Sequence, residues 1–350
     1  MFGAYQGVWS TALETLFADS TTRGAHRAEA TARKFGLTLL ATTAGPALAL
    51  ILFLCIGDDW SLAALKTVAV VGLALCAPPA LLLLGLRDVG ADACDDEEAD
   101  KEGDEGIARL ILVADLISGF GSGMTVKFIP LFFKNRAGFS PVAANALSIG
   151  AALVMICGSR VCEKWSQSAG KARVCAVCMV LAAIALIGLA WADAGRVDVL
   201  RPGRPALTTT IKRAGAVLLY LITCAQHACR PLKKAALNDH VPHAARGRWN
   251  ALDGVTRFGW SGSAVLGGYL VDRGGYALTF VVTAATQLIA ALVWLALIGR
   301  VDPHTAGLVP RRRAPTEDSL EEPLMEEAAP TTRATSGSFV VDDYSEMPRG

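Results

Sequence analysis

The sequence predicts an all-α bundle of about nine helices that cross a lipid membrane. Hydrophobic residues make up 53% of the 350 residues and charged residues only 19%, whereas an ordinary soluble domain carries about 25% charged residues. The charges gather in short runs, and they leave apolar stretches of about 20 residues, the length that crosses the hydrocarbon core of a bilayer. Because backbone groups in lipid must hydrogen-bond within their own segment, we expect these stretches to be helices.

Nine stretches fit this description, taken in order from the N-terminus. The third contains Pro78 and Pro79, which we expect to kink the helix, a distortion that neighbouring helices make tolerable in a membrane. The predicted spans are residues 2–18, 35–56, 66–86, 108–131, 141–159, 174–192, 213–233, 252–271 and 277–299.

Two segments are too polar to cross a membrane. Residues 87–107 include the run Asp95-Asp96-Glu97-Glu98 and predict an acidic linker, and residues 303–350 are rich in Pro, Thr, Ser and Glu and predict a disordered tail. Lys and Arg residues concentrate in the loops after the first, fifth and seventh spans, which places those loops, the linker and the tail in the cytoplasm. The basic loop at 193–212 disagrees with this orientation.

A sequence repeat with an offset of 223 residues links two parts of the chain. It aligns Arg23-Gly24 with Arg246-Gly247, Phe35-Gly36 with Phe258-Gly259, and Gly45 with Gly268. The second predicted span is thereby matched to the eighth, six helices later, as expected for a transporter built from two six-helix halves. We therefore predict three helices of a first half in residues 1–86, the acidic cytoplasmic linker at 87–107, and a complete six-helix second half in residues 108–302.

Several motifs resemble those of the major facilitator superfamily of membrane transporters. Pro242-x-x-x-Arg246-Gly247-Arg248 looks like the cytoplasmic loop between helices ten and eleven of that superfamily, and Gly45-Pro46 resembles the Gly-Pro motif of its helix five. Residues 14–20, 115–127 and 248–263 resemble a eukaryotic general substrate transporter group within it. The resemblance covers about residues 5–300 and implies that the first three helices of the fold are lacking. The superfamily's loop motif between helices two and three is absent.

The fourth predicted span carries a polar face inside the membrane. Asp115, Ser118, Ser122 and Thr125 follow one another at spacings of three, four and three, which places them on one side of a helix. Polar groups in a span usually face the bundle interior or a wet cavity, so we predict that this face lines the path of a solute. The glycines at 119, 121 and 123 fit either local bending or close helix packing.

The seventh predicted span carries a second polar face, formed by Thr223, Gln226, His227 and Arg230. Arg230 precedes a proline and also fits an interfacial position. If transport is coupled to protons, Asp115 and His227 are the titratable groups that we expect to carry the coupling, because histidine changes charge near neutral pH. The sequence leaves the coupling itself open.

Charged residues at cytoplasmic helix ends form a candidate gate, which consists of Asp19, Arg23, Asp239, Arg246 and Arg248. Opposite charges at such positions can pair in one conformation and separate in another, which would bias an alternating-access equilibrium. Anchoring of the cytoplasmic side by positive residues explains the arginines equally well.

The remaining reactive side chains do not indicate catalysis. Cys175 and Cys178 form a CxxC pair within an apolar span that has no second CxxC, and we interpret them as buried thiols. No catalytic or nucleotide-binding motif stands in a suitable context, so no cofactor or metal is predicted. The net charge of +1 is not the strongly basic charge that a nucleic-acid-binding protein would carry.

The sequence as a whole predicts a multi-pass protein of the lipid bilayer that transports a small-molecule solute and is not an enzyme. The alternative is a truncated membrane protein that does not transport and acts at most as a binding partner.

Overall fold

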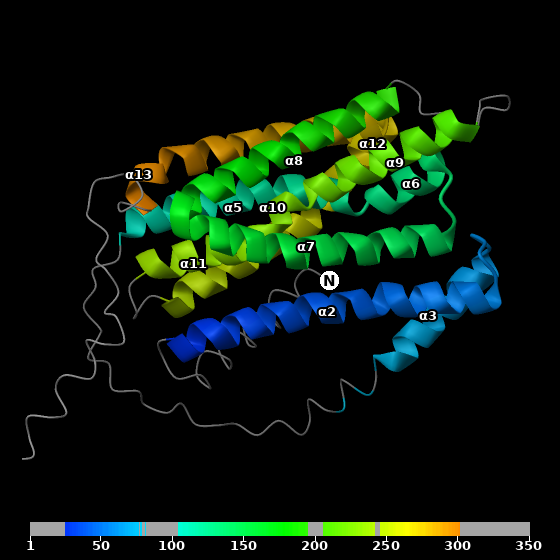
Figure 1. Cartoon of the computed structure of the whole chain (residues 1–350), viewed down its shortest axis with the longest axis horizontal. Helices are drawn as coiled ribbons and strands as arrows, with labels where there is room; N and C mark the ends of the chain where they lie inside the picture. The colour runs from blue at the N-terminus through cyan, green and yellow to red at the C-terminus, as the bar shows by residue number, and fades with distance from the viewer. Residues whose placement is uncertain are drawn as a thin grey trace, which may run out of the picture. The chain divides into compact units, whose positions relative to one another are not determined.

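The computed structural model describes residues 25–76, 78, 81, 104–194, 206–241 and 246–301. Regular structure in this part of the chain is entirely α-helical (Figure 1). Five helical stretches in it are long and apolar enough to cross a membrane, namely 36–56, 105–137, 141–169, 171–193 and 254–296. The predicted span 2–18, the acidic linker up to residue 103 and the predicted tail lie outside the described residues.

Helices α2 (Ala25–Ile56) and α3 (Leu62–Leu75) come first among the described elements. Helix α2 begins ten residues before the predicted span, because the stretch before it is rich in alanine and other good helix formers. Ser61 caps α3 by accepting a hydrogen bond from the Ala64 N–H at 3.2 Å. Helix α3 ends at Leu75, shortly before the two prolines.

The fourth predicted span is longer than expected and consists of α5 (Glu105–Val126) and α6 (Ile129–Ala137). Asp104 caps α5 by accepting hydrogen bonds from the N–H groups of Gly106 and Ile107. The break before α6 is explained by Pro130, which has no N–H to donate to the carbonyl of Val126, four residues earlier. Helix α6 ends at Gly138, whose φ of 65° is accessible to glycine at little cost.

Helices α7 (Pro141–Ala169) and α8 (Lys171–Ala194) form a hairpin that turns at Gly170. The seventh predicted span, 213–233, is not one helix. It is divided among α9 (Ala206–Thr223), α10 (Ala225–Ala228) and α11 (Arg230–His240), with breaks at Cys224 and Cys229. Pro231 explains the second break, because it has no N–H to donate to a carbonyl of the preceding turn.

The last two predicted spans lie in α12 (Arg246–Ala296), which is followed by the short α13 (Ile298–Val301). Gly275 interrupts α12 with a φ of 72° and a ψ of −174°. This interruption falls between the predicted spans 252–271 and 277–299, so α12 consists of two arms that meet at a glycine.

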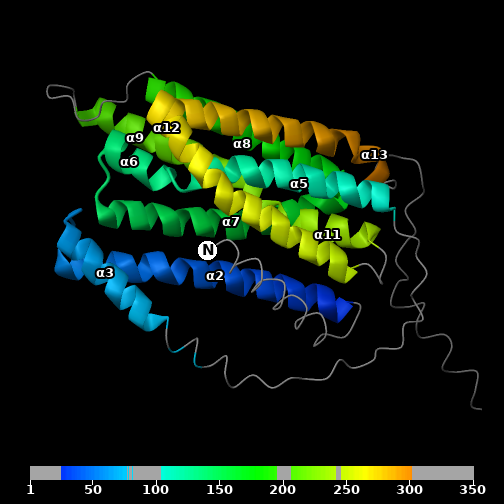
Figure 2. The ribbon, with the colours of Figure 1, turned by 180° about the vertical axis from the view of Figure 1, so that it is seen from behind.

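Helix α12 packs along α5 and α8, and α2 packs along α7 (Figures 1 and 2). Glycines allow α5 and α12 to approach closely: a Cβ added at Gly123 of α5 would lie 2.0 Å from the Trp260 carbonyl oxygen, and one added at Gly267 of α12 would lie 2.2 Å from the Met124 carbonyl oxygen. Two apolar clusters surround this contact, one that includes Met179 and Trp294 and one that includes Phe132 and Phe280. The packing brings the two predicted polar faces toward each other.

Candidate functional site

A cavity of about 190 Å³ lies between α5, α7, α8, the α9–α11 segment and α12. Six of the eight residues predicted to line a solute path contribute to its wall, from two separate segments of the chain. They are Ser122, Thr125, Thr223, Gln226, His227 and Arg230. The structure therefore places parts of both polar faces at one cavity, and their role in transport stays a prediction.

Most hydroxyl groups of the cavity wall are engaged by the protein itself. Thr125 shares a hydrogen bond with Thr283, whose hydroxyl donates to the Gly121 carbonyl at 3.0 Å. The Thr223 hydroxyl donates to the Tyr220 carbonyl within the same helix. These bonds fix the hydroxyl groups of the cavity wall, so that other polar groups remain to contact a solute.

Two buried polar atoms of the wall have no hydrogen-bond partner in the described part of the protein. They are the Gln226 side-chain oxygen and the indole nitrogen of Trp260. Buried polar groups are normally paired, since an unpaired one costs about 1–3 kcal/mol. The cavity thus offers one acceptor and one donor to a molecule inside it, beside His227, whose Nε2 lies 3.5 Å from the Ser122 hydroxyl oxygen.

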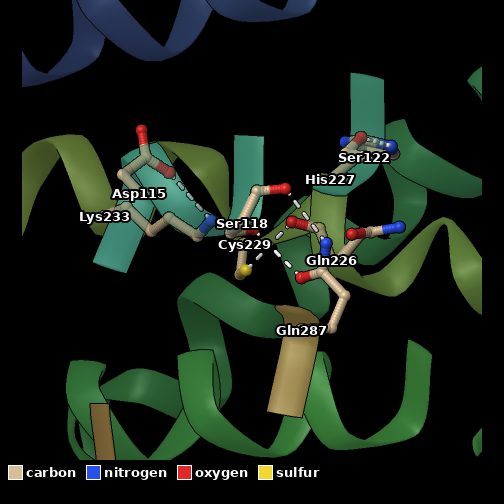
Figure 3. Close-up of polar contacts among 8 residues, drawn as sticks. All are labelled: Asp115, Ser118, Ser122, Gln226, His227, Cys229, Lys233 and Gln287. Atoms are coloured by element: carbon tan, nitrogen blue, oxygen red, sulfur yellow. Dashed lines mark hydrogen bonds and ion pairs between the residues drawn. The ribbon is translucent and has the colours of Figure 1, made fainter. Parts of the chain in front are cut away.

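The other two predicted pathway residues do not line the cavity but pair with neighbouring helices (Figure 3). The Lys233 ammonium donates to Asp115 at 3.0 Å, and only 6% of the Lys233 side chain is exposed. The Ser118 hydroxyl donates to the Gln287 side-chain oxygen at 3.0 Å, and the Gln287 amide donates to the Ser118 carbonyl at 3.0 Å. Asp115 and Ser118 therefore join α5 to α11 and α12.

Sequence reasoning missed Lys233 and Gln287, although a signal for each was present. Gln226, Arg230 and Lys233 follow one another at spacings of four and three, so Lys233 continues the polar face of the seventh predicted span. Gln287 is a polar residue in the middle of the apolar span 277–299. Polar residues in spans usually have a partner, and the partners here are the predicted α5 residues.

The side chains of two predicted gate residues, Asp239 and Arg248, lie within the described part of the chain. Asp239 forms an ion pair with Lys171, which joins the end of α11 to the start of α8. Arg248 is exposed near the start of α12. Asp19, Arg23 and the side chain of Arg246 lie outside the described residues, so the predicted pairing across the gate is not tested.

A further ion pair, between Arg136 of α6 and Asp193 of α8, was not anticipated. The Arg136 Nε lies 2.8 Å from one carboxylate oxygen, and the other oxygen accepts the Ala277 N–H at 2.9 Å. The contact ties α6, the end of α8 and the second arm of α12 together beside the Gly275 break.

A helical bundle of apolar spans around a cavity with polar side chains in its wall is the architecture of a multi-pass integral membrane protein. The family model described as Major Facilitator Superfamily matches residues 1–200, more than half of the chain. The chain belongs to the major facilitator superfamily, and it is a membrane transporter. This result confirms the predicted fold class, resemblance and membrane location, and it does not favour the alternative of a truncated, non-transporting protein.

The superfamily consists of transporters that are generally not enzymes, in agreement with the predicted class of function. The general substrate transporter subgroup, the lack of three helices and the division at residues 87–107 stay predictions. No curated protein and no solved structure matches the chain significantly.

Proposed function

We propose that the chain is a secondary transporter that carries a small polar solute through the cavity by alternating access. The observation that supports this function most strongly is the meeting of polar side chains from α5 and from the α9–α11 segment around one cavity. Polar groups are costly in a membrane interior, and they are typically retained where they contact a solute, an ion or water.

The size of the cavity limits the solute. A volume of about 190 Å³ is below the roughly 300–1,000 Å³ of pockets that hold drug-sized ligands. A solute of a few heavy atoms, or one end of a larger solute, fits this space.

The unpaired atoms of the wall define the chemistry of the solute. The Trp260 indole N–H requires an acceptor, and the Gln226 side-chain oxygen requires a donor. Apolar contacts come from Val126, Ile129 and Met155. We therefore favour a small solute that carries both an acceptor and a donor next to a short apolar portion.

Helix breaks beside the cavity support a moving wall. The α9–α11 segment is broken at Cys224 and Cys229, on either side of Gln226 and His227. Interrupted helices lack part of the regular backbone hydrogen bonding, and they are the elements that transporters use to bind solutes and change conformation. Rearrangement of this segment against α5 would open the cavity to alternate sides.

Coupling to protons remains part of the proposal, but we assign different roles to the two candidate residues, Asp115 and His227. Tyr220, Cys224, His227 and Arg230 are the titratable residues that line the cavity among those described. Histidine is the one among them that changes charge near neutral pH, so we assign the proton to His227. Asp115 would act through Lys233 as a positioning residue.

Ligand screening by thermal shift, with purified protein and a panel of small polar solutes, tests this function. A stabilising solute is then used in uptake assays with proteoliposomes that contain wild type or Trp260→Phe, a variant that keeps the ring and removes the N–H donor. Loss of a hydrogen bond of about 1.4 kcal/mol would weaken binding about tenfold. Trp191→Phe, which changes a side chain on α8 that is 80% exposed, is the matched control. Equal affinities of the two variants would contradict the proposed binding site.

A further inference from the structure

The described wall of the cavity carries positive charge and no negative charge. Arg230 lines the cavity and is a cation throughout the physiological pH range. His227 is either neutral or positive, and the other polar residues of the wall are uncharged at neutral pH. No Asp or Glu belongs to the described residues that line the cavity. The wall therefore has a net charge of at least one positive unit.

The carboxylate that was predicted for the solute path does not offset this charge at the wall. Asp115 lies outside the wall and accepts a hydrogen bond from the Lys233 ammonium at 3.0 Å (Figure 3). Only 6% of the Lys233 side chain is exposed, so this buried ammonium requires the carboxylate. Asp115 and Lys233 are neutral as a unit, and the excess of positive charge at the cavity is that of Arg230.

An anionic solute supplies the charge that the wall lacks. Net charge is costly in a membrane interior, and a guanidinium presents its N–H donors in a fork that matches the two oxygens of a carboxylate. Arg230 is also the first residue of α11, and the first turn of a helix carries partial positive charge. A cation would meet like charge at this wall, and a dianion such as phosphate would keep one charge unmatched. The charge balance therefore favours a monoanion.

The two unpaired atoms of the wall specify the rest of the solute. The Trp260 indole N–H is a further donor for a carboxylate oxygen, and the Gln226 side-chain oxygen accepts a hydrogen bond from a donor on the solute. A hydroxyl group supplies this donor without charge. An ammonium group would supply it too, but it would add positive charge to a wall that is already positive.

We propose that the cavity binds small hydroxycarboxylates with a single negative charge, and that Arg230 recognises their charge. This inference rests on the proposed function and names the class of solute for the same site. The carboxylate contacts Arg230 and the Trp260 N–H, the hydroxyl donates to Gln226, and the short carbon chain packs on the apolar part of the wall.

Matched probe molecules test the charge of the solute directly. Isothermal titration calorimetry is performed on the purified full chain, in a non-ionic detergent and at constant ionic strength. Lactate is compared with lactamide, which replaces the carboxylate by a neutral amide, and with alanine, which replaces the hydroxyl by an ammonium group. We expect lactate to bind about tenfold more tightly than either, because a charge-assisted hydrogen bond is lost or a like charge is added. Inorganic phosphate is expected to bind more weakly than lactate.

Three results of this series would overturn the inference. The first is an affinity for lactamide or alanine that equals the affinity for lactate. The second is tighter binding of phosphate than of lactate, which would indicate a general anion site. The third is an absence of lactate binding.

Variants of Arg230 test whether this residue is responsible for the preference. Arg230→Gln is expected to weaken lactate binding about tenfold and to change lactamide binding little, so that the preference for the anion disappears. Arg230→Lys keeps the charge and is expected to keep the preference, and it replaces the first variant if Arg230→Gln does not fold. Arg160→Gln removes the same charge from an exposed position on α7 outside the cavity wall and is the matched control. A preference for lactate that persists in Arg230→Gln would overturn the role of Arg230.

Uptake assays in proteoliposomes separate this inference from the proposed function. Lactate that binds through Arg230 but is not taken up would support the charged site and contradict transport through it. Uptake of a neutral solute that lactate does not inhibit would support transport and overturn the charged site.

Discussion

Helix α2 and the first arm of α12 share the sequence repeat but have different surroundings. In α12, a Cβ added at Gly259 would lie 3.5 Å from Leu116 of α5, and one added at Gly268 would lie 3.5 Å from Phe128. In α2, a Cβ added at the aligned Gly36 or Gly45 would meet no atom within 4 Å in the described part of the protein.

The flanking residues of the two helices show the same contrast. Trp260 and Ser263 of α12 lie against Gly123 of α5, whereas the aligned Leu37 and Leu40 of α2 are 67% and 53% exposed. A repeated pattern of small residues therefore defines a helix face that is able to pack closely. Whether the face is packed depends on the presence of a complementary helix, which α5 supplies through Gly119 and Gly123.

The largest loss of stability is expected from removal of a charge at the contact between α5 and α11. Asp115→Asn keeps the size of the side chain but leaves the Lys233 ammonium buried without a carboxylate, and breaking a buried pair in this way costs about 3–5 kcal/mol. Thermal unfolding in detergent measures the loss. Asp59→Asn in the exposed loop after α2 is the control, with little change expected. An equally stable Asp115→Asn would mean that the pair does not hold α5 to α11.

The double variant Asp115→Leu/Lys233→Met sharpens this prediction. It removes both charges, and apolar replacement of a buried pair is often neutral or stabilising. We expect it to recover most of the stability that Asp115→Asn loses. A double variant as unstable as Asp115→Asn would assign the loss to packing rather than to the unpaired ammonium.

The next effect tests the close contact of α5 and α12 directly. Gly123→Ala places a methyl group 2.0 Å from the Trp260 carbonyl oxygen, so the helices must separate. Overpacking of this kind costs about 1–3 kcal/mol. Unfolding temperatures of Gly123→Ala and wild type in detergent provide the measurement, and an unchanged temperature would argue against the contact.

A smaller effect is expected from the polar contact between the same helices. Gln287→Leu removes both hydrogen bonds with Ser118 and leaves the Ser118 carbonyl and hydroxyl to find other partners. We expect a loss of about 1–2 kcal/mol, measured in the same unfolding assay. The same substitution at an exposed position near the end of α7, Gln167→Leu, serves as the matched control, because surface substitutions usually change stability by less than about 0.5 kcal/mol. Equal losses of stability for the two variants would show that Gln287 has no special role in joining α5 to α12.

The smallest expected effect is a gain rather than a loss of stability, and it concerns a substitution in α2. Gly36→Ala adds a methyl group where no atom lies within 4 Å, and alanine favours a helix over glycine by up to about 1 kcal/mol. We therefore expect unchanged or slightly higher stability. Marked destabilisation would show that the face of α2 is packed, and the contrast with α12 would then be wrong.

Much of the architecture was accessible from local sequence patterns. The hydropathy of the chain predicted helical spans, and the break between 271 and 277 was found at Gly275. The division of 213–233 into three helices was not predicted, although Pro231 is a local signal for one of its breaks. Boundaries shifted where helices continue beyond the apolar stretch, as at Ala25 and Ala169, because helix propensity does not end with hydropathy.

The candidate site was likewise predictable only in part. By itself, the sequence determined which residues are polar within spans and which of them share a helix face, because both properties depend on composition and on the helical period. Only the tertiary structure decided that Asp115 pairs with Lys233, 118 residues away, and that Ser118 pairs with Gln287, 169 residues away. Which side chains meet depends on how helices pack, and a helical period alone carries no information about the partner helix.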